Sequence, residues 1–558
     1  MDSHVRTHPL LRRSTWGGLL LLLAVPLASG PAIAQEPARD VTAAVDELFQ
    51  WATDATPGCA VAVSEDGVRV VDRAYGSADL GAEVPLTPET RFDAGSVVKQ
   101  VVAAAVLLLV EDGRIALDDD VRLYVPELPD PGHVVTVDHL LTHTGGVRDW
   151  TALRRMASDD ADALTLVLRQ RGLTFAPGDE WAYSNSGYVL LKELVARVAG
   201  APFSEVVQRR LFDPLGMAST VYADDPQRGH DRLAVAYQGE GNTWEPGVLA
   251  GNERGGGGAL LTTAGDLLTW TEALGDGRLG TFVTETIQAP ARLNSGREIG
   301  YARGLFLDVI GGARAVWHSG SAGAYKALAA RFPEHGLALA VLCNAGDGME
   351  PMRFAGPIRQ LFLPDIDDAP TETASAAGVD VESRAGLFFG EESAEPLRLV
   401  AQGGRLRVAG GPALVPVAEG RFRNAEGALP FWSEDRVEIR FVSPDAFELV
   451  TSAGDVVRYR RPEPEAHSAA ELAAFAGRYE SDELRAVLEV AAGADGLTVR
   501  LNGSRPFDFV PVARDVFHLG PMTGRFRRDE AGRVVALDYS SPVLRDVRFV
   551  RQADASHP

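Results

Sequence analysis

The chain has 558 residues, of which 46% are hydrophobic and 23% charged, with a formal net charge of −23. This length and composition fit roughly three to four globular domains and exclude a small stapled fold or a disordered chain. The acidic balance argues against nucleic acid and anionic membranes as partners, because both reward clustered basic side chains. Of 54 basic residues only three are lysine, namely Lys99, Lys192 and Lys326.

The first 34 residues are typical of an export signal. Arginines precede an apolar run over 19–28, and Ala32-Ile33-Ala34 is a small-x-small cleavage site. We expect an exported protein, periplasmic or secreted, with no membrane-spanning segment after signal removal; an uncleaved N-terminal anchor is the alternative. The pair Arg12-Arg13 leaves both the general and the twin-arginine export routes open.

The two cysteines, Cys59 and Cys343, lie in short apolar runs that predict strands over 58–63 and 337–343. Export makes a disulfide chemically possible. We nevertheless expect two buried reduced thiols that behave as small hydrophobic residues.

Composition divides the rest of the chain into a long first part and two shorter ones. Residues 35–363 mix helical and strand patterns, and 364–380 form an acidic, proline-bearing linker. A second break at Pro462-Glu463-Pro464-Glu465 separates residues 381–462 from residues 468–552.

These last two parts repeat each other. Ala385-Gly386-Leu387-Phe388 recurs as Ala476-Gly477-Arg478-Tyr479, and Val457-Arg458-Tyr459 recurs as Val547-Arg548-Phe549. Both copies alternate apolar and polar residues with period two, which predicts antiparallel strands. We expect two small closed barrels, because closure removes exposed sheet edges.

The long first part contains a segment, 96–111, with almost no polar residue after Gln100. A helix that is apolar on every side belongs inside a domain. Its N-terminus is therefore held rigidly, and there Ser96 and Lys99 stand three residues apart, on one helical face. A serine hydroxyl needs a base to become a nucleophile, and a desolvated lysine can supply one where arginine cannot.

Two further motifs carry reactive groups. Tyr183 and Asn185 follow turn residues at 176–178 and precede an apolar helix over 188–198; the phenol can relay protons, and the amide can bind a substrate carbonyl. His318-Ser319-Gly320-Ser321 precedes a predicted strand over 326–332. Gly320 allows close approach to this edge, and the backbone N–H groups of Ser321 and Ser96 would form an oxyanion hole.

In this order, the three motifs resemble those of the serine β-lactamase and penicillin-binding-protein superfamily, in its class C-like branch. The resemblance covers about residues 42–350 and includes the helix-ending segment 140–146. It implies an α/β two-lobe β-lactamase/transpeptidase-like fold, with an antiparallel sheet and an all-α lobe. A serine acyl-enzyme would form in the groove between the lobes, with no cofactor and a small-molecule or peptide substrate.

The third motif departs from the penicillin-processing members, which have a lysine where this chain has His318. An unperturbed histidine is mostly neutral at pH 7 and binds a carboxylate less well. Relatives that act on N-terminal D-amino acid amides or on esters are therefore favoured over a β-lactamase or a D-Ala-D-Ala carboxypeptidase. The appended units point the same way, since they resemble the paired eight-stranded, lipocalin-like barrels of bacterial D-aminopeptidases, in which a loop of the last barrel narrows the active site. The turn at 526–532 is our candidate for that loop.

Two alternatives of other classes are less well supported. His139 and His143 have metal-ligand spacing, but no further ligand cluster accompanies them, so we expect no metal site. A non-catalytic penicillin-binding or sensor protein would not need every motif position to be chemically competent. The sequence leaves the oligomeric state open.

Overall fold

The part of the chain that the structure describes begins at Val41. The computed structural model describes residues 41–225, 230–239, 243–247, 258–310, 312–346, 351–364, 366, 380–391, 396–409, 411, 413–424, 437–451, 456–462, 467–494, 496–520, 522–541 and 543–553. The predicted export signal and nearly all of the predicted linker lie outside these residues. Within them, every helix is too short or too polar to span a membrane.

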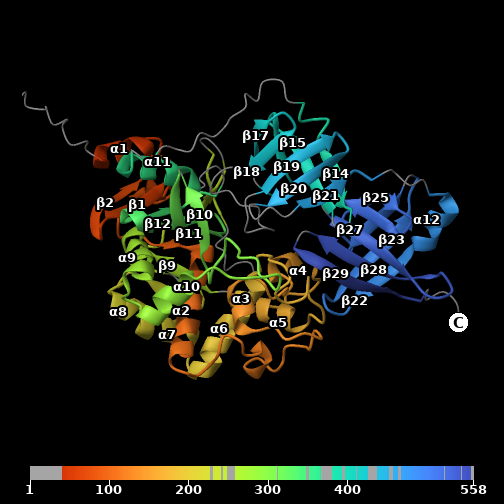
Figure 1. Ribbon diagram of the computed structural model, residues 1–558, viewed down its shortest axis with the longest axis horizontal. Coiled ribbons are helices and arrows are strands. Elements are labelled where there is room, and N and C mark those ends of the chain that lie inside the picture. The colour runs from red at the N-terminus through yellow and green to blue at the C-terminus, as the bar shows by residue number, and fades with distance from the viewer. Residues whose placement is uncertain are drawn as a thin grey trace, which may run out of the picture. The chain divides into compact units, whose positions relative to one another are not determined.

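A six-stranded antiparallel sheet is the frame of the first part (Figure 1). Its strands, in spatial order, are β10 (Phe306–Ile310), β11 (Ala313–Ala322), β12 (Tyr325–Phe332), β13 (Leu337–Cys343), β1 (Cys59–Glu65) and β2 (Val68–Tyr75). The strands predicted at 58–63, 326–332 and 337–343 are thus present. The first strand of the chain is inserted beside the last strand of this part, which ties its two ends together.

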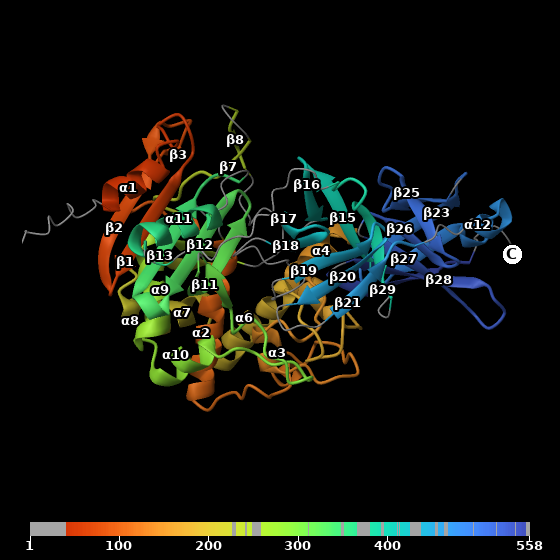
Figure 2. The same ribbon diagram turned by 45° about the horizontal axis from the view of Figure 1, so that its top comes forward.

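Both faces of the sheet are covered by helices, as Figures 1 and 2 show. Successive strand residues point to opposite faces. Val61 and Val63 therefore join a cluster with α1 (Val41–Leu48) and α11 (Met352–Phe362). Ala60 and Ala62 join the larger cluster on the other face, which includes α9 (Ala264–Asp276).

The buried helix predicted at 96–111 is present as α2 (Val98–Glu111), preceded by one 3-10 turn, η1 (Gly95–Val97). Residues 99–107 and 109 of α2 are buried. It packs directly against α6 (Asn185–Ala199), α7 (Phe203–Val207) and α10 (Thr281–Gln288). Other helices of this region are α3 (Val137–Leu141), α4 (Trp150–Met156), α5 (Ala163–Leu168) and α8 (Asp213–Leu215). The antiparallel sheet with helices confirms the predicted class of fold for this part.

The expectation of two reduced thiols is wrong, because Cys59 and Cys343 form a disulfide. The residues stand directly opposite each other where β1 pairs with β13, and both are fully buried. Their partnership depends on the pairing of strands that lie 284 residues apart in the chain.

The C-terminal region contains two eight-stranded antiparallel sheets, as the repeated motifs predict (Figure 2). The first sheet consists of β14 (Gly386–Gly390), β15 (Pro396–Gln402), β16 (Arg405–Val408), β17 (Leu414–Ala418), β18 (Arg421–Asn424), β19 (Val437–Ser443), β20 (Ala446–Thr451) and β21 (Val456–Arg460). The second consists of β22 (Gly477–Ser481), β23 (Ala486–Ala492), β24 (Leu497–Leu501), β25 (Phe507–Ala513), β26 (Val516–Leu519), β27 (Met522–Arg528), β28 (Val534–Ser541) and β29 (Leu544–Arg551), with α12 (Ala469–Phe475) before it.

The two copies have the same cyclic strand order and differ in closure. The second is a closed barrel. The first is barrel-like, with an edge between β16 and β17 that carries the isolated bridge Arg407↔Ala413. The repeated motifs begin the first strand and lie in the eighth strand of each copy.

The predicted loop at 526–532 makes its side-chain contacts inside the second barrel. Phe526 is part of the barrel core, and Arg528 bonds to Asp515. The barrel instead contacts loops of the first part, at Arg148 and Glu180, through Glu483 between β22 and β23 and through Arg545 at the start of β29.

Candidate active site

The structure brings the first two motifs together at the N-terminus of α2. Lys99 Nζ lies 3.2 Å from Ser96 Oγ and 2.9 Å from Asn185 Oδ1. Ser96 lies in the 3-10 turn, Lys99 in the first turn of α2, and Asn185 at the start of α6. An amine between a serine hydroxyl and an amide oxygen is positioned to accept the serine proton once it is neutral.

The surroundings of Lys99 favour its neutral form. The residue is only 4% exposed, and burial lowers the pKa of its amine to about 7, against an opposing contribution from Asp149. Its hydrogen-bond partners, Ser96 Oγ and Asn185 Oδ1, are neutral oxygens, so neither adds a carboxylate charge that would hold the proton on the amine. A large fraction of Lys99 is therefore unprotonated near neutral pH.

Tyr183 lies just before α6 and contacts both Ser96 and Lys99. Its hydroxyl hydrogen-bonds Ser96, and burial raises the pKa of this phenol. A phenol with a raised pKa stays neutral and can both donate and accept a proton. The arrangement thus favours a proton relay over a phenolate base.

The third motif lies against Ser96 because two glycines permit contact between backbones. A Cβ on Gly320 of β11 would lie 1.9 Å from the Ala94 carbonyl oxygen and 3.1 Å from the Ser96 nitrogen. A Cβ on Gly95, whose φ is +53°, would lie 2.7 Å from the Ser321 nitrogen. The sequence predicts that Gly320 admits substrate, whereas in the structure a glycine is required there by the contact with the 3-10 turn itself. The same contact brings the backbone nitrogens of Ser96 and Ser321 to one place.

One half of β11 offers its edge beside this turn. β10 pairs with residues 313–317, and no described strand pairs with the outer edge of residues 318–322. Free backbone groups on a strand edge can hydrogen-bond an extended chain. The edge is therefore suited to align a peptide-like substrate beside Ser96.

His318 is buried and neutral. Burial and the nearby Lys99 lower the pKa of its imidazole to about 3. Its Nδ1 lies 2.6 Å from the Ser319 carbonyl oxygen, which can only accept, so Nδ1 carries the proton. Nε2 is then left to accept from the Tyr301 hydroxyl at 3.3 Å. The third motif thus supplies no positive charge.

Sequence reasoning missed four residues that surround these groups. His143, Tyr188 and Tyr301 form an aromatic cluster with Tyr183, and Asp149 accepts hydrogen bonds from Asn185. The sequence singles out His143 only as half of a metal-ligand pair, whereas its buried Nδ1 accepts a hydrogen bond from the Ser184 backbone N–H. The sequence signal for Asp149 is weak: an aspartate before Trp150 indicates a helix cap, which it is, but gives no hint of Asn185.

Comparisons with known proteins show which family the chain resembles. The family model described as Beta-lactamase matches residues 41–362. The D-aminopeptidase of Brucella anthropi is 25% identical over 525 residues, which cover 89% of this chain and 95% of that protein. Penicillin-binding protein 4* of Bacillus subtilis (strain 168) is 28% identical over 314 residues, 52% of this chain and 68% of that one.

Among solved structures, the octameric penicillin-binding protein homologue from Pyrococcus abyssi matches with a TM-score of 0.52 and 22% identity. The match covers 75% of this chain and 98% of that chain. This likeness concerns the fold alone.

Proposed function

Because the chain belongs to the Beta-lactamase family and is a serine hydrolase of the D-aminopeptidase and penicillin-binding-protein type, we propose that it is an exported peptidase that releases N-terminal D-amino acids. The observation that carries the mechanism is the buried Lys99 amine between Ser96 Oγ and Asn185 Oδ1. The D-aminopeptidases that align over 89% of the chain support the substrate class.

Acylation begins when neutral Lys99 accepts the Ser96 proton and Ser96 Oγ attacks the scissile carbonyl carbon. The carbonyl π-electrons move to oxygen, and the resulting oxyanion is stabilised by the backbone N–H groups of Ser96 and Ser321. Each such donor contributes about 3–4 kcal/mol in related chemistry. The proton then passes from Lys99 through Tyr183 to the leaving amine as the C–N bond breaks.

Deacylation reverses these roles. Water gives a proton to the same groups and attacks the ester carbonyl, and the Ser96 oxygen leaves with that proton. Throughout, the Asn185 amide holds the Lys99 amine and contacts the substrate. The raised pKa of Tyr183 keeps it in the neutral form that a relay requires.

The neutral His318 argues against a β-lactamase or a D-Ala-D-Ala carboxypeptidase. These substrates carry a carboxylate beside the scissile bond, and a buried imidazole with a pKa of about 3 offers that carboxylate no charge at pH 7. Esters need no such cation, and the same acyl-enzyme chemistry would hydrolyse them. An esterase is therefore the second candidate.

The test of substrate class is a panel measured on one preparation of the purified protein. It contains D-alanine p-nitroanilide, L-alanine p-nitroanilide, p-nitrophenyl acetate and a chromogenic cephalosporin. We expect the highest kcat/KM for the D-anilide. Faster hydrolysis of the ester would favour the esterase, and strong turnover of the cephalosporin would overturn the proposal in favour of a β-lactamase.

The test of the nucleophile is Ser96→Ala, for which we expect a loss of about 1,000-fold or more in kcat. The matched control is Ser64→Ala, since Ser64 is a buried serine of β1. Incubation of the wild type with a reactive ester, followed by mass spectrometry, separates an enzyme from a sensor protein. An enzyme forms an acyl-Ser96 that decays, whereas a sensor would keep it.

Export has its own test. The N-terminus of protein recovered from outside the cytoplasm should begin at Gln35. Recovery of the protein with Met1 retained would contradict cleavage of the predicted signal.

A further inference from the structure

We propose that Asp149 is a positioning residue for the reaction. Its carboxylate fixes the Asn185 amide so that the amide oxygen faces Lys99. The second barrel holds Asp149 in place through the neighbouring residue Arg148. This inference rests on the roles proposed above for Ser96 and Lys99. Asp149 belongs to none of the three sequence motifs and touches no reacting atom.

The Asp149 carboxylate joins two elements. Its Oδ2 accepts from the Asn185 backbone N at 2.6 Å and from Asn185 Nδ2 at 3.0 Å. Its Oδ1 accepts from the Thr151 backbone N at 2.9 Å and so caps α4. The residue is 4% exposed, so few water molecules can replace these bonds.

The chemistry of these bonds decides which way the amide points. A carboxylate only accepts, so the amide nitrogen must face Asp149 and the amide oxygen must face away from it. Lys99 then meets an acceptor, at 2.9 Å. A flipped amide would place oxygen against oxygen at Asp149 and N–H against the lysine amine when that amine is protonated. Asp149 thus fixes where the Lys99 Nζ rests, and Lys99 in turn contacts Ser96.

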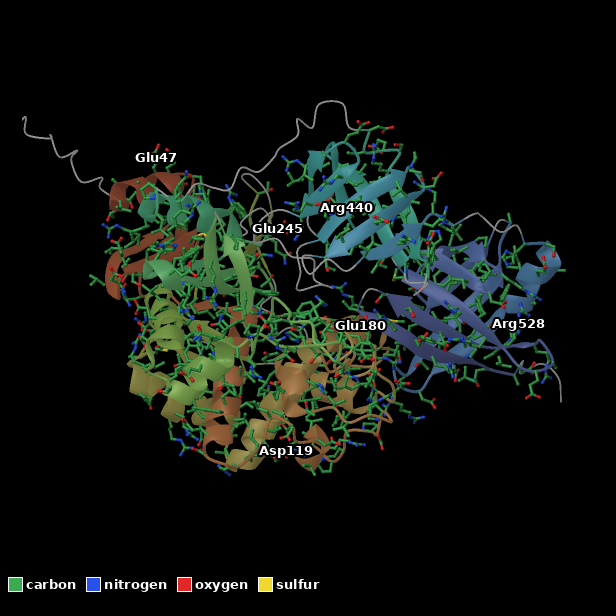
Figure 3. The ribbon with its side chains drawn as sticks, in the orientation of Figure 1. Glu47, Asp119, Glu180, Glu245, Arg440 and Arg528 are labelled. Atoms are coloured by element: carbon green, nitrogen blue, oxygen red, sulfur yellow. A yellow bond between two sulfur atoms is a disulfide. The ribbon has the colours of Figure 1, made fainter. Side chains whose placement is uncertain are left out.

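The second barrel holds the backbone on one side of Asp149. Arg148 Nη1 donates to Glu483 at 2.8 Å, and its Nη2 donates to the carbonyls of Arg545 at 3.0 Å and Asp546 at 2.9 Å. Arg148 is 3% exposed, and the barrel supplies three of the acceptors that its buried charge needs; Gln170 Oε1, in the first part, is a fourth at 3.3 Å. Arg545 also pairs with Glu180, which is labelled in Figure 3.

The backbone around Asp149 is also fastened to α6. The Ser186 hydroxyl donates to the Arg148 carbonyl at 2.7 Å. The same hydroxyl oxygen accepts from the Trp150 backbone N–H at 2.8 Å. Leu153 and Met156 of α4 pack in one cluster with the barrel core. Asp149 therefore stands between a barrel contact and the first turn of α6, where Asn185 lies.

The test is Asp149→Asn, a change of nearly equal shape. Asparagine caps helices as well as aspartate does, so α4 should persist. With its oxygen used by Thr151, however, its NH₂ group faces the two N–H donors of Asn185, and the amide must turn away from Lys99. We expect kcat to fall about 10- to 100-fold, the scale of a small misplacement of reacting groups, with KM changed less than about twofold.

The matched control is Asp162→Asn. Asp162 also caps a helix, α5, where its Oδ1 accepts from the Thr165 backbone N–H. This variant measures how much kcat changes when one helix-capping carboxylate is lost, and we expect no change. An equal fall in kcat for both variants would show a general structural effect and overturn the proposal.

A double-mutant cycle tests the route through Asn185. In an Asn185→Ala background no amide is left to orient, so Asp149→Asn should cost less than about twofold there. If Asp149→Asn cost the same factor in both backgrounds, Asp149 would not act through Asn185.

The pH profile gives a second readout that a merely structural residue would not move. Asp149 raises the pKa of Lys99, so removal of its charge should move the acid limb of kcat/KM to lower pH. The other titratable groups that face Lys99 are His143 and His318, whose pKa values are lowered by burial, and Tyr183 and Tyr188, whose pKa values are raised. None of these changes charge near neutral pH. An unmoved limb would contradict the proposed placement of the charge.

The outcomes separate this inference from the proposed mechanism. If Ser96→Ala is inactive and Asp149→Asn retains full kcat, only the role of Asp149 fails. If Ser96→Ala is active, the mechanism itself fails, whatever Asp149→Asn does.

Discussion

Two buried basic side chains lie in neighbouring regions of the molecule and have opposite surroundings. Lys99 in the candidate active site contacts a hydroxyl, an amide oxygen and aromatic rings. Arg148, at the contact with the second barrel, contacts the carboxylate of Glu483 and two carbonyl oxygens. Both side chains are at least nine-tenths buried.

The difference shows that the contacting groups decide whether a buried basic side chain keeps its proton. Without a carboxylate in contact, desolvation lowers the pKa of Lys99 until the amine can act as a base. With a carboxylate and carbonyls in contact, the guanidinium keeps its charge and joins two parts of the chain. A chain with three lysines among 54 basic residues has one of them where a proton must be released.

The largest effect is expected for Lys99→Arg, which places a guanidinium that stays protonated in the candidate active site, where a base is needed. Arginine does not lose its proton, so we expect kcat to fall about 10²- to 10⁴-fold. Lys192→Arg is the control, because Lys192 is a second lysine whose burial lowers its pKa, outside the motifs. Lys99→Arg with activity within about twofold of the wild type would contradict the assignment of Lys99 as the base.

The next largest effect is expected for Glu483→Ala. This variant leaves Arg148, like Lys99, without a carboxylate in contact. The buried guanidinium would lose its carboxylate, at a cost of about 3–5 kcal/mol in the free energy of unfolding. Glu480→Ala is the control: it removes an exposed partner of Arg478 in the same barrel and should cost less than about 1 kcal/mol. Denaturant unfolding measures both, and equal losses would show that the Arg148 contact does not stabilise the fold as described.

The disulfide tests whether stability and the site chemistry are separable. Cys59 and Cys343 join β1 to β13 on the sheet face that α1 and α11 cover, which is opposite to the face of α9. A Cys59→Ala, Cys343→Ala double variant should lose about 2–4 kcal/mol of stability. Its kcat/KM profile against pH should match the wild type, and a shifted acid limb would show that the disulfide does influence the electrostatics of Lys99.

The smallest effect concerns the pH profile of the unaltered protein. Lys99 acts only when neutral, so kcat/KM should fall as pH drops through about 7 and the amine takes up a proton. Burial also raises the pKa of Asp93, which bonds to the Gly95 N–H, to about 6. Asp93→Asn is therefore the control. A limb that disappears in Asp93→Asn would assign the titration to Asp93 and not to Lys99.

The sequence by itself determined what depends on local spacing. The i, i+3 geometry of a helix relates Ser96 to Lys99, a run without polar residues predicted the buried α2, and period-two alternation with repeated motifs predicted the two eight-stranded sheets. Apart from the repeat, which compares two separate stretches of the sequence, each of these patterns is contained in a few turns or one strand. Neighbouring residues are enough to express it.

Only the tertiary structure decided what depends on distant segments that pack together. The disulfide required β1 to pair with β13, and the lowering of the His318 pKa far below its ordinary value required burial beside Lys99. The place of Asp149 required α4 and α6 to meet, which local patterns cannot encode because the pairing of faces depends on the packing of the whole domain. The scarcity of lysine draws attention to Lys99 in the sequence, and only the fold buries its amine so that its pKa falls.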